Sequence, residues 1–221
     1  VLRDREIRRD MFLVVCKEKA ADYIRGNKSE LETRPHKFYE FMAQRWKETG
    51  LVPVSTIHLL IQSFEQRAGL FLNIYGTTQP VPSDEKRNED EYLPGAIDKT
   101  GGNPLQIIGS AVFRNGVMVG SMTGEETRLC QLLRPHYKVQ SLLTSYPDPE
   151  KNEPRVSARI IKDENAEIKI DLDQEFPVIH VRVPVLFDIL AIPSDIDYIS
   201  DREKQKQLEQ HISGILSEKA M

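Results

Sequence analysis

The sequence of 221 residues is poor in cysteine, with only Cys16 and Cys130. The two residues stand far apart, form no C-x-x-C pattern, and have no histidine or further cysteine at the spacing of metal ligands. Each lies in an apolar stretch, which favours buried free thiols over a disulfide or a redox pair. A fold held together by disulfide bonds is therefore excluded.

Long apolar runs are also absent, since no stretch approaches the roughly 18 apolar residues of a membrane-spanning helix. The longest candidate, residues 178–192, is interrupted at four places, by His180, Arg182, Pro184 and Asp188. The chain shows no signal peptide and opens on Val1, so we expect its natural N-terminus, with any targeting signal, to lie upstream. Met221 follows an amphipathic helix without a stop signal, and we expect that end to be cut as well.

The chain has no basic excess, because 30 basic side chains face 34 acidic ones and the formal net charge is −4. Residues 1–100 are neutral, and the whole acidic excess follows them. The arginines near the N-terminus alternate with acids and indicate a solvated surface: Arg3, Arg5, Arg8 and Arg9 beside Asp4, Glu6 and Asp10. Nucleic-acid binders gather basic charge on one face, so nucleic acid is not expected as a partner.

Motifs of catalysis and cofactor binding are missing as well: G-x-G-x-x-G, G-x-x-x-x-G-K-[ST], G-x-S-x-G and H-E-x-x-H do not occur. Ser121 only superficially resembles a nucleophile elbow, because it directly follows the first glycine of its segment. Glu125 and Glu126 would point about 100° apart on a helix and cannot flank one bond.

Metal-binding patterns are equally lacking. The five histidines stand singly, without a partner at i+3 or i+4: His36, His58, His136, His180 and His211. Asp195, Asp197 and Asp201 lack the glycine and the terminal glutamate of a calcium loop. We therefore predict no catalytic, cofactor-binding or metal-binding residue and no cofactor, and the sequence identifies no binding residue.

The composition that remains is that of an ordinary globular protein, with 39% hydrophobic and 29% charged residues. The first part predicts a strand over 11–16, a helix over 17–25 that stops at Gly26, and a helix over 36–49 with Gly50 as its left-handed C-cap. A third helix is capped by Ser55 and ends at Gly69, and a strand follows over 70–75.

Residues 77–105 differ from their surroundings, being rich in proline and glycine, dense in charge and without periodicity. Such a segment is either a flexible loop or a link between domains. We therefore divide the chain into 1–76, the remainder of an N-terminal α+β domain, 77–105, a linker or loop, and 106–221, a C-terminal α+β domain.

The clearest local pattern follows this segment. Residues 106–114 and 117–122 flank Asn115-Gly116, which favours a hairpin with a type I′ turn. Thr123 and Glu126 then form a capping box that opens a helix running to Pro135.

The C-terminal part predicts three or four strands, over 137–146, 155–163, 167–173 and 178–185. Strict alternation in 167–172 indicates an antiparallel sheet with one wet face. A second capping box, from Ser200 to Glu203, opens a long helix with a buried stripe at Leu208, Ile212, Ile215 and Leu216. The predicted fold class is α+β, with two domains or subdomains, each a mixed or antiparallel sheet packed with helices.

Two blocks of the sequence carry a family resemblance. The first is Arg-Asp-Arg-Glu-Ile-Arg-Arg at 3–9 with Leu-Val-Val-Cys-Lys-Glu-Lys-Ala-Ala-Asp-Tyr-Ile at 13–24. The second is Ile-Ile-Gly-Ser-Ala-Val-Phe-Arg-Asn-Gly-Val-Met-Val-Gly at 107–120, continuing into Glu-Glu-Thr-Arg at 125–128. In this order and separation they resemble the Ger(x)C family, the lipoprotein C subunits of bacterial spore germinant receptors. The resemblance covers nearly the whole chain and is diagnostic of fold rather than of chemistry, since the family has no active site to carry over.

The resemblance implies an extended α+β protein of several domains on the outer face of the spore inner membrane. It implies a lipid anchor, including palmitate, on an N-terminal cysteine, and two membrane-embedded receptor subunits as partners. The sequence departs from the family pattern in lacking the signal peptide, the lipidated cysteine and the first part of the N-terminal domain. Cys16 and Cys130 lie within predicted elements, so neither is the lipid site. We expect this piece itself to be soluble, and monomeric in isolation.

Three functions stay open at this point. The resemblance favours a non-enzymatic receptor subunit that is needed for nutrient-triggered germination. The second is an extracytoplasmic module that binds the small-molecule nutrient itself, with 77–105 as a lid. The third is a hydrolase with a dispersed site outside any known motif.

Overall fold

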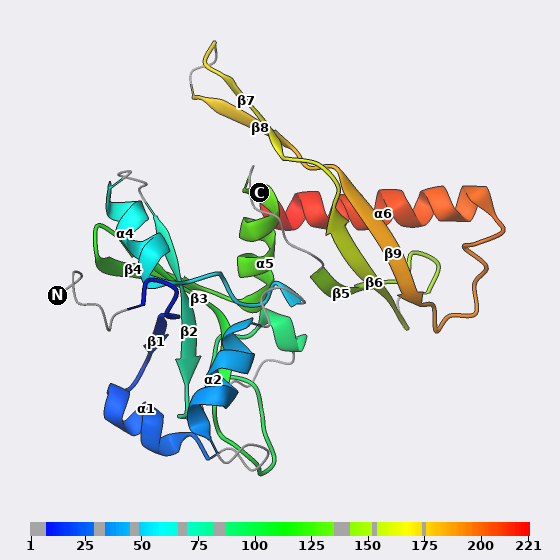
Figure 1. The fold of residues 1–221 in the computed structure, drawn as a ribbon. Coiled ribbons are helices and arrows are strands. Elements are labelled where there is room, and N and C mark those ends of the chain that lie inside the picture. The colour runs from blue at the N-terminus through cyan, green and yellow to red at the C-terminus, as the bar shows by residue number, and fades with distance from the viewer. Residues whose placement is uncertain are drawn as a thin grey trace. The chain divides into compact units, whose positions relative to one another are not determined.

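The structure, a computed structural model, describes residues 8–28, 34–44, 49–65, 70–81, 87–134, 142–151, 154–173 and 176–221 (Figure 1). The predicted α+β class is confirmed. The chain divides into two compact units, one formed by Val1–Trp46 and Leu51–Arg128 and the other by Lys47–Gly50 and Leu129–Met221. The predicted domain division at 77–105 rests on composition rather than on packing, and it stays a prediction.

The first unit is built on a four-stranded mixed sheet in the order β1-β2-β3-β4, with β1 parallel to β2 and the other pairs antiparallel. The strands are β1 Val14–Cys16, β2 Phe71–Thr77, β3 Gln106–Arg114 and β4 Val117–Met122. The helices are α1 Ala20–Gly26, α2 Pro35–Gln44, α4 Ile57–Glu65, the 3-10 turn η1 Glu89–Glu91, and the start of α5, Gly124–Leu133. The core of the unit consists of Tyr23, Val52, Ile74, Leu105 and Ile107.

The predicted hairpin and capping box are confirmed. The φ angles of Asn115 and Gly116 are 51° and 80°, both positive as a type I′ turn requires. At the start of α5, the Thr123 amide donates to Glu126 Oε2 at 2.8 Å and the Glu126 amide donates to Thr123 Oγ1 at 3.2 Å. These contacts span only a few residues, which is why the sequence predicts them correctly.

A β-bulge interrupts the pairing of β2 with β3, where the register shifts between Ile74 and Gly76. Gly109 lies at this bulge with a φ of 74°, and its amide donates to Leu51 O at 2.7 Å. A Cβ at this position would collide with the carbonyl oxygen of Met122. Only glycine meets both conditions, because it has no side chain and tolerates positive φ.

The predicted cap of the helix α4 needs correction. The helix α4 is capped by Thr56, whose Oγ1 accepts from the Leu59 amide at 3.3 Å, and not by Ser55, which is buried and donates to Asn73 Oδ1. Gly50 has the predicted left-handed conformation, with a φ of 67°. The predicted residues 45–48, 66–69 and 137–141 lie outside the described residues, as do the N-terminal residues 1–7.

The described residues of the 77–105 segment are tied to the first unit by side-chain hydrogen bonds. The Gln106 side chain accepts from the amides of Gly95 and Ile97 and donates to Ile97 O. The Glu18 carboxylate accepts from Thr77 Oγ1 and from the amide and hydroxyl of Thr78, at 2.6–2.7 Å. Burial alone would raise the pKa of Glu18, but these hydrogen bonds outweigh it and hold the pKa below its ordinary value.

The second unit contains a three-stranded antiparallel sheet in the order β5-β6-β9 and a long helix, α6. The strands are β5 Leu142–Pro147, β6 Arg155–Lys162 and β9 Val185–Ala191, and the helix is α6 Arg202–Ala220. On β6 the alternate residues Val156, Ala158 and Ile160 are fully buried, and Leu208 and Ile212 of α6 belong to the same core. The predicted apolar stripe of this helix is confirmed.

The predicted strand over 178–185 is wrong in its extent, because the structure contains two strands in this region. β8 covers Val178–Arg182 and pairs with β7, Glu167–Asp171, whereas β9 begins at Val185 and pairs with β6. Pro184 lies between them and has no amide hydrogen for a sheet. Its carbonyl instead accepts from the Asp163 amide at 3.2 Å.

The start of α6 also differs from the prediction. The cap is Asp201, whose Oδ1 accepts from the amides of Glu203 and Lys204, rather than Ser200. In the loop that precedes α6, Ser194 Oγ and Tyr198 Oη donate to the fully buried carboxylate of Asp148, both at 2.6 Å. This carboxylate links the end of β5 to the loop between β9 and α6.

Candidate interaction surface

Several of the acidic residues that the sequence analysis considered as catalytic or metal-binding candidates cap helices or hold turns in the structure. Glu126 caps α5, Asp201 caps α6, and Asp197 accepts from the amides of Ile199 and Ser200. Among the described residues, no three histidine, cysteine, aspartate or glutamate side chains are placed to hold one metal ion. Cys16 and Cys130 are both free thiols. His136 lies outside the described residues.

A pocket of about 320 Å³ in the first unit is formed by the segment that the sequence suggested as a lid. Its polar side chains include Gln106 and Lys99. The Gln106 amide already bonds to Gly95 and Ile97, and Lys99 Nζ donates to Leu105 O at 2.7 Å. These groups hold the loop together, so this pocket does not favour a nutrient site.

An unusual surface lies on the strands β7 and β8 of the second unit. They form a two-stranded sheet that continues from β6 and β9 (Figure 1). We call residues 163–184, between β6 and β9, the arm. In its register Ile168 stands opposite Val181, and Ile170 stands opposite Ile179. Opposed residues and residues two apart share one side of a sheet, so these four side chains form the apolar face of the arm.

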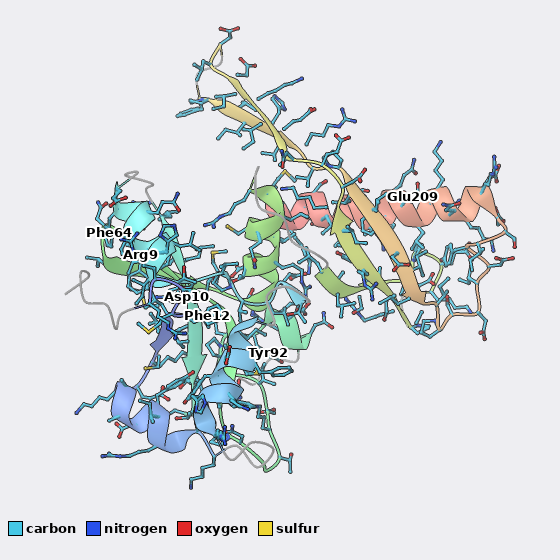
Figure 2. All side chains as sticks on the ribbon, viewed as in Figure 1. Arg9, Asp10, Phe12, Phe64, Tyr92 and Glu209 are labelled. Carbon is cyan, nitrogen blue, oxygen red and sulfur yellow. The ribbon has the colours of Figure 1, made fainter. Side chains whose placement is uncertain are left out.

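The apolar face is exposed. Ile170 and Ile179 are 60% and 59% exposed, Ile168 and Val181 are 45% and 40% exposed. Beyond the paired residues, Leu172 and Phe176 are 72% and 75% exposed. The antiparallel pairing predicted from the alternation in 167–172 is confirmed, but the wet face is not the only exposed one, because most side chains on both faces of β7 and β8 are exposed (Figure 2).

The opposite face of the arm is polar. Glu167 stands opposite Arg182, and Lys169 stands opposite His180. Antiparallel sheets commonly have one polar, solvated face and one apolar, buried face. The arm has the same division into a polar and an apolar face, but in the described part of the chain its apolar face is largely exposed. Exposed apolar patches with polar borders mark interaction sites in soluble domains.

At its base the apolar face continues into a groove of about 420 Å³ within the second unit. The groove is lined by Ile179 and Val181 of the arm, Leu132 and Leu133 of α5, and Leu216 and Ala220 of α6. The arm and the groove therefore present a continuous apolar surface that can receive part of another molecule.

Comparisons with known proteins place this surface in a family. Residues 108–221 match the sequence model of the spore germination B3/GerAC-like proteins, C-terminal part. This match covers more than half of the chain. The chain belongs to the spore germination B3/GerAC-like family. The arm, the groove and α6 all lie within the matched residues.

The crystal structure of the GerBC protein is similar to this structure, with a TM-score of 0.56 and 15% sequence identity. The similarity covers 99% of this chain and 54% of the GerBC chain, so the chain spans about half the length of that protein. At this identity the likeness shows a shared fold. No curated protein sequence matches the chain. Among the described residues, no helix combines the length and the apolar composition that crossing a bilayer demands.

The sequence predicts the strands of the arm but not the exposure of its apolar face. The alternation of isoleucine and valine in 167–172 and 178–181 was the available signal. Alternation reveals that one face is apolar, whereas the layer that would cover it is a property of the tertiary structure.

Proposed function

We propose that this chain is part of a non-enzymatic subunit of a spore germinant receptor. In this proposal the whole protein is needed for nutrient-triggered germination and acts by contacting membrane-embedded receptor subunits. A lipid anchor outside this chain holds it at the outer face of the spore inner membrane. Membership of the spore germination family supports this setting.

The observation that carries the proposal is the exposed apolar face of the arm. Burying the exposed remainder of each of its four side chains would contribute about 1 kcal/mol apiece. A second molecule that covers this face recovers that free energy, whereas an isolated chain does not. The residues that form the face are therefore suited to hold a partner.

The domain division belongs to this proposal. Residues 106–221 would form the C-terminal germination domain, 77–105 a connecting segment, and 1–76 the remainder of an N-terminal domain. The family match, which begins at residue 108, supports the position of the second boundary.

The experiment uses a spore-forming strain in which every paralogue of the protein has been deleted. The full-length protein in this strain carries two substitutions in the apolar face, I170D/I179D. We expect the response to nutrients to be lost, while a trigger that bypasses the receptors still causes germination. The matched control, E167A/K169A, changes the polar face of the same arm without altering its net charge and should leave the nutrient response intact. A normal nutrient response in I170D/I179D spores would refute the proposed role of the arm.

A further inference from the structure

The charge of the arm indicates what kind of molecule its apolar face binds. We propose that the face binds a protein segment whose apolar side chains are bordered by lysine and arginine. This inference deepens the proposed function, on which it rests for the identity of the setting, but the chemistry follows from the arm alone.

The arm carries the entire net charge of the chain. Residues 163–184 contain six acidic side chains and two basic ones: Asp163, Glu164, Glu167, Asp171, Asp173 and Glu175 against Lys169 and Arg182. The net charge of the arm is therefore −4, which equals that of the whole sequence, and the remaining residues are neutral. A field of one sign around an apolar patch selects partners of the opposite sign.

The acids lie close to the apolar face. Asp171 ends β7 directly after Ile170 and stands opposite Val178, so it borders the apolar face from the polar side of the arm, and the Asp173 amide donates to Asp171 Oδ1 at 2.9 Å. This turn places two acidic residues beside Leu172, a highly exposed apolar side chain of the arm. Both acids fall within about one Debye length of the apolar face at physiological salt, so the partner's border experiences their field.

An anionic bilayer is a poorer occupant than a basic protein segment. Leu172 and Phe176 would suit the apolar interior of a membrane. However, the negative surface potential of anionic lipids repels a segment with six acids and two bases. Interfacial binding segments have the reverse composition, with lysine and arginine on the polar face.

A second copy of the chain is also a poorer occupant. Pairing two arms through their apolar faces would bring two segments of net charge −4 together. Like charges across an interface oppose association and act as a device against the wrong partner. A basic border on a different protein removes this repulsion and supplies attraction instead.

Site-specific photocrosslinking in spores tests the inference. A photoreactive phenylalanine analogue replaces Ile170 or Ile179 in the full-length protein, and Glu167 or Lys169 on the opposite face in matched controls. After illumination, mass spectrometry identifies the crosslinked segment. We expect at least a fivefold higher crosslink yield from the apolar face, to one protein segment that contains apolar residues flanked by lysine or arginine.

A charge-reversal variant isolates the electrostatic part of the inference. With the analogue at position 179, D171K/D173K should lower the crosslink yield about tenfold, since rim charges contribute on this order when several act together. The control E40K/E209K makes the same change in charge at exposed positions of α2 and α6, and should leave the yield unchanged (Figure 2 labels Glu209).

Four outcomes would overturn the inference: crosslinks to lipid, crosslinks to a second copy, crosslinks to a segment without basic residues, or yields no higher than those of the controls. An unchanged yield in D171K/D173K would do the same. Loss of the nutrient response together with lipid crosslinks would sustain the proposed function and refute this inference. If the expected crosslinks form but spores carrying I170D/I179D still respond to nutrients, this inference stands and the proposed role of the arm in germination is refuted.

Discussion

Ile170 of β7 and Ile179 of β8 stand directly opposite each other, and each exposes more than half of its side chain. Ile160, in the neighbouring sheet, stands opposite Leu142 and Phe187 and is 1% exposed. The same residue type in the same kind of element therefore has two different environments within one unit. The difference separates residues that stabilise the fold from residues that are available to a partner.

The first prediction concerns this contrast in the purified chain. Replacing both exposed residues by the polar strand former threonine, I170T/I179T, should change the free energy of unfolding by less than about 1 kcal/mol. I160T should lower it by about 2 kcal/mol or more, because it removes buried apolar atoms and buries a hydroxyl. Urea denaturation measures both. A large loss of stability in I170T/I179T would mean that the face is packed in the isolated chain.

The second prediction concerns the pH dependence that Asp148 imposes. Burial alone would raise the pKa of Asp148, but hydrogen bonds from Ser194, Tyr198 and two backbone amides hold the pKa below its ordinary value. A lowered folded-state pKa contributes stability in full above the unfolded pKa, near 4, and loses it as the pH falls through the folded value. The folded state should therefore become less stable in acid.

The variant D148N tests this assignment. It should be about 1–3 kcal/mol less stable than the unmodified chain at pH 7, because hydrogen bonds to a buried charged group are lost. The gap should narrow below pH 4, as the aspartate of the unmodified chain becomes protonated. D188N is the control, since Asp188 forms an exposed ion pair with Arg159 at 3.5 Å, and its replacement should cost less than about 1 kcal/mol. A pH-independent gap would contradict the role of Asp148.

The third prediction compares two glycines of the first sheet. G109A should destabilise the chain by about 3 kcal/mol or more, because it forces a side chain into positive φ and toward the Met122 carbonyl. G120A is its control, since among the described residues no atom apart from those of its two chain neighbours lies within 4 Å of a Cβ built at Gly120. This change should alter stability by less than about 1 kcal/mol. Equal melting temperatures for the two variants would exclude the bulge as a constraint.

The fourth prediction distinguishes the two candidate caps of α6. D201A should cost about 1 kcal/mol, because the amides of Glu203 and Lys204 lose their acceptor. S200A, at the position that the sequence predicted, should cost clearly less. Thermal unfolding followed by circular dichroism compares them, and a larger effect of S200A would restore the predicted capping box.

Local contacts explain why some parts of the fold are predictable. The turn at Asn115-Gly116 needs two positive φ angles that these residue types favour, and the capping box joins Thr123 to Glu126 within one helical turn. By contrast, choosing between Ser200 and Asp201 as a cap requires the path of the preceding loop. The capping-box pattern selected Ser200, whereas the structure uses the next residue, Asp201, which is also of a type that caps helices.

Long-range contacts explain the parts that were missed. Asp148 accepts hydrogen bonds from Ser194 and Tyr198, which lie 46 and 50 residues further along the chain. No local sequence pattern therefore predicts this cluster. The separate strand β9 was missed for a related reason. The chain changes its pairing at Pro184, because β8 before it pairs with β7 and β9 after it pairs with β6. Which strand pairs with which is decided by the whole unit.

The amino-acid order alone determined four features: the α+β class, the hairpin, the apolar stripe of α6 and the resemblance to a germination family. Each depends on residues close together in the sequence or on a recognisable sequence motif. Tertiary structure decided which apolar faces are covered. Isoleucines in β6 and in β7 follow the same alternating pattern, but Ile160 of β6 is buried in one core with residues of α6, whereas Ile168 and Ile170 of β7 are 45% and 60% exposed. Periodicity shows that a face is apolar, and only packing determines whether the chain itself buries it.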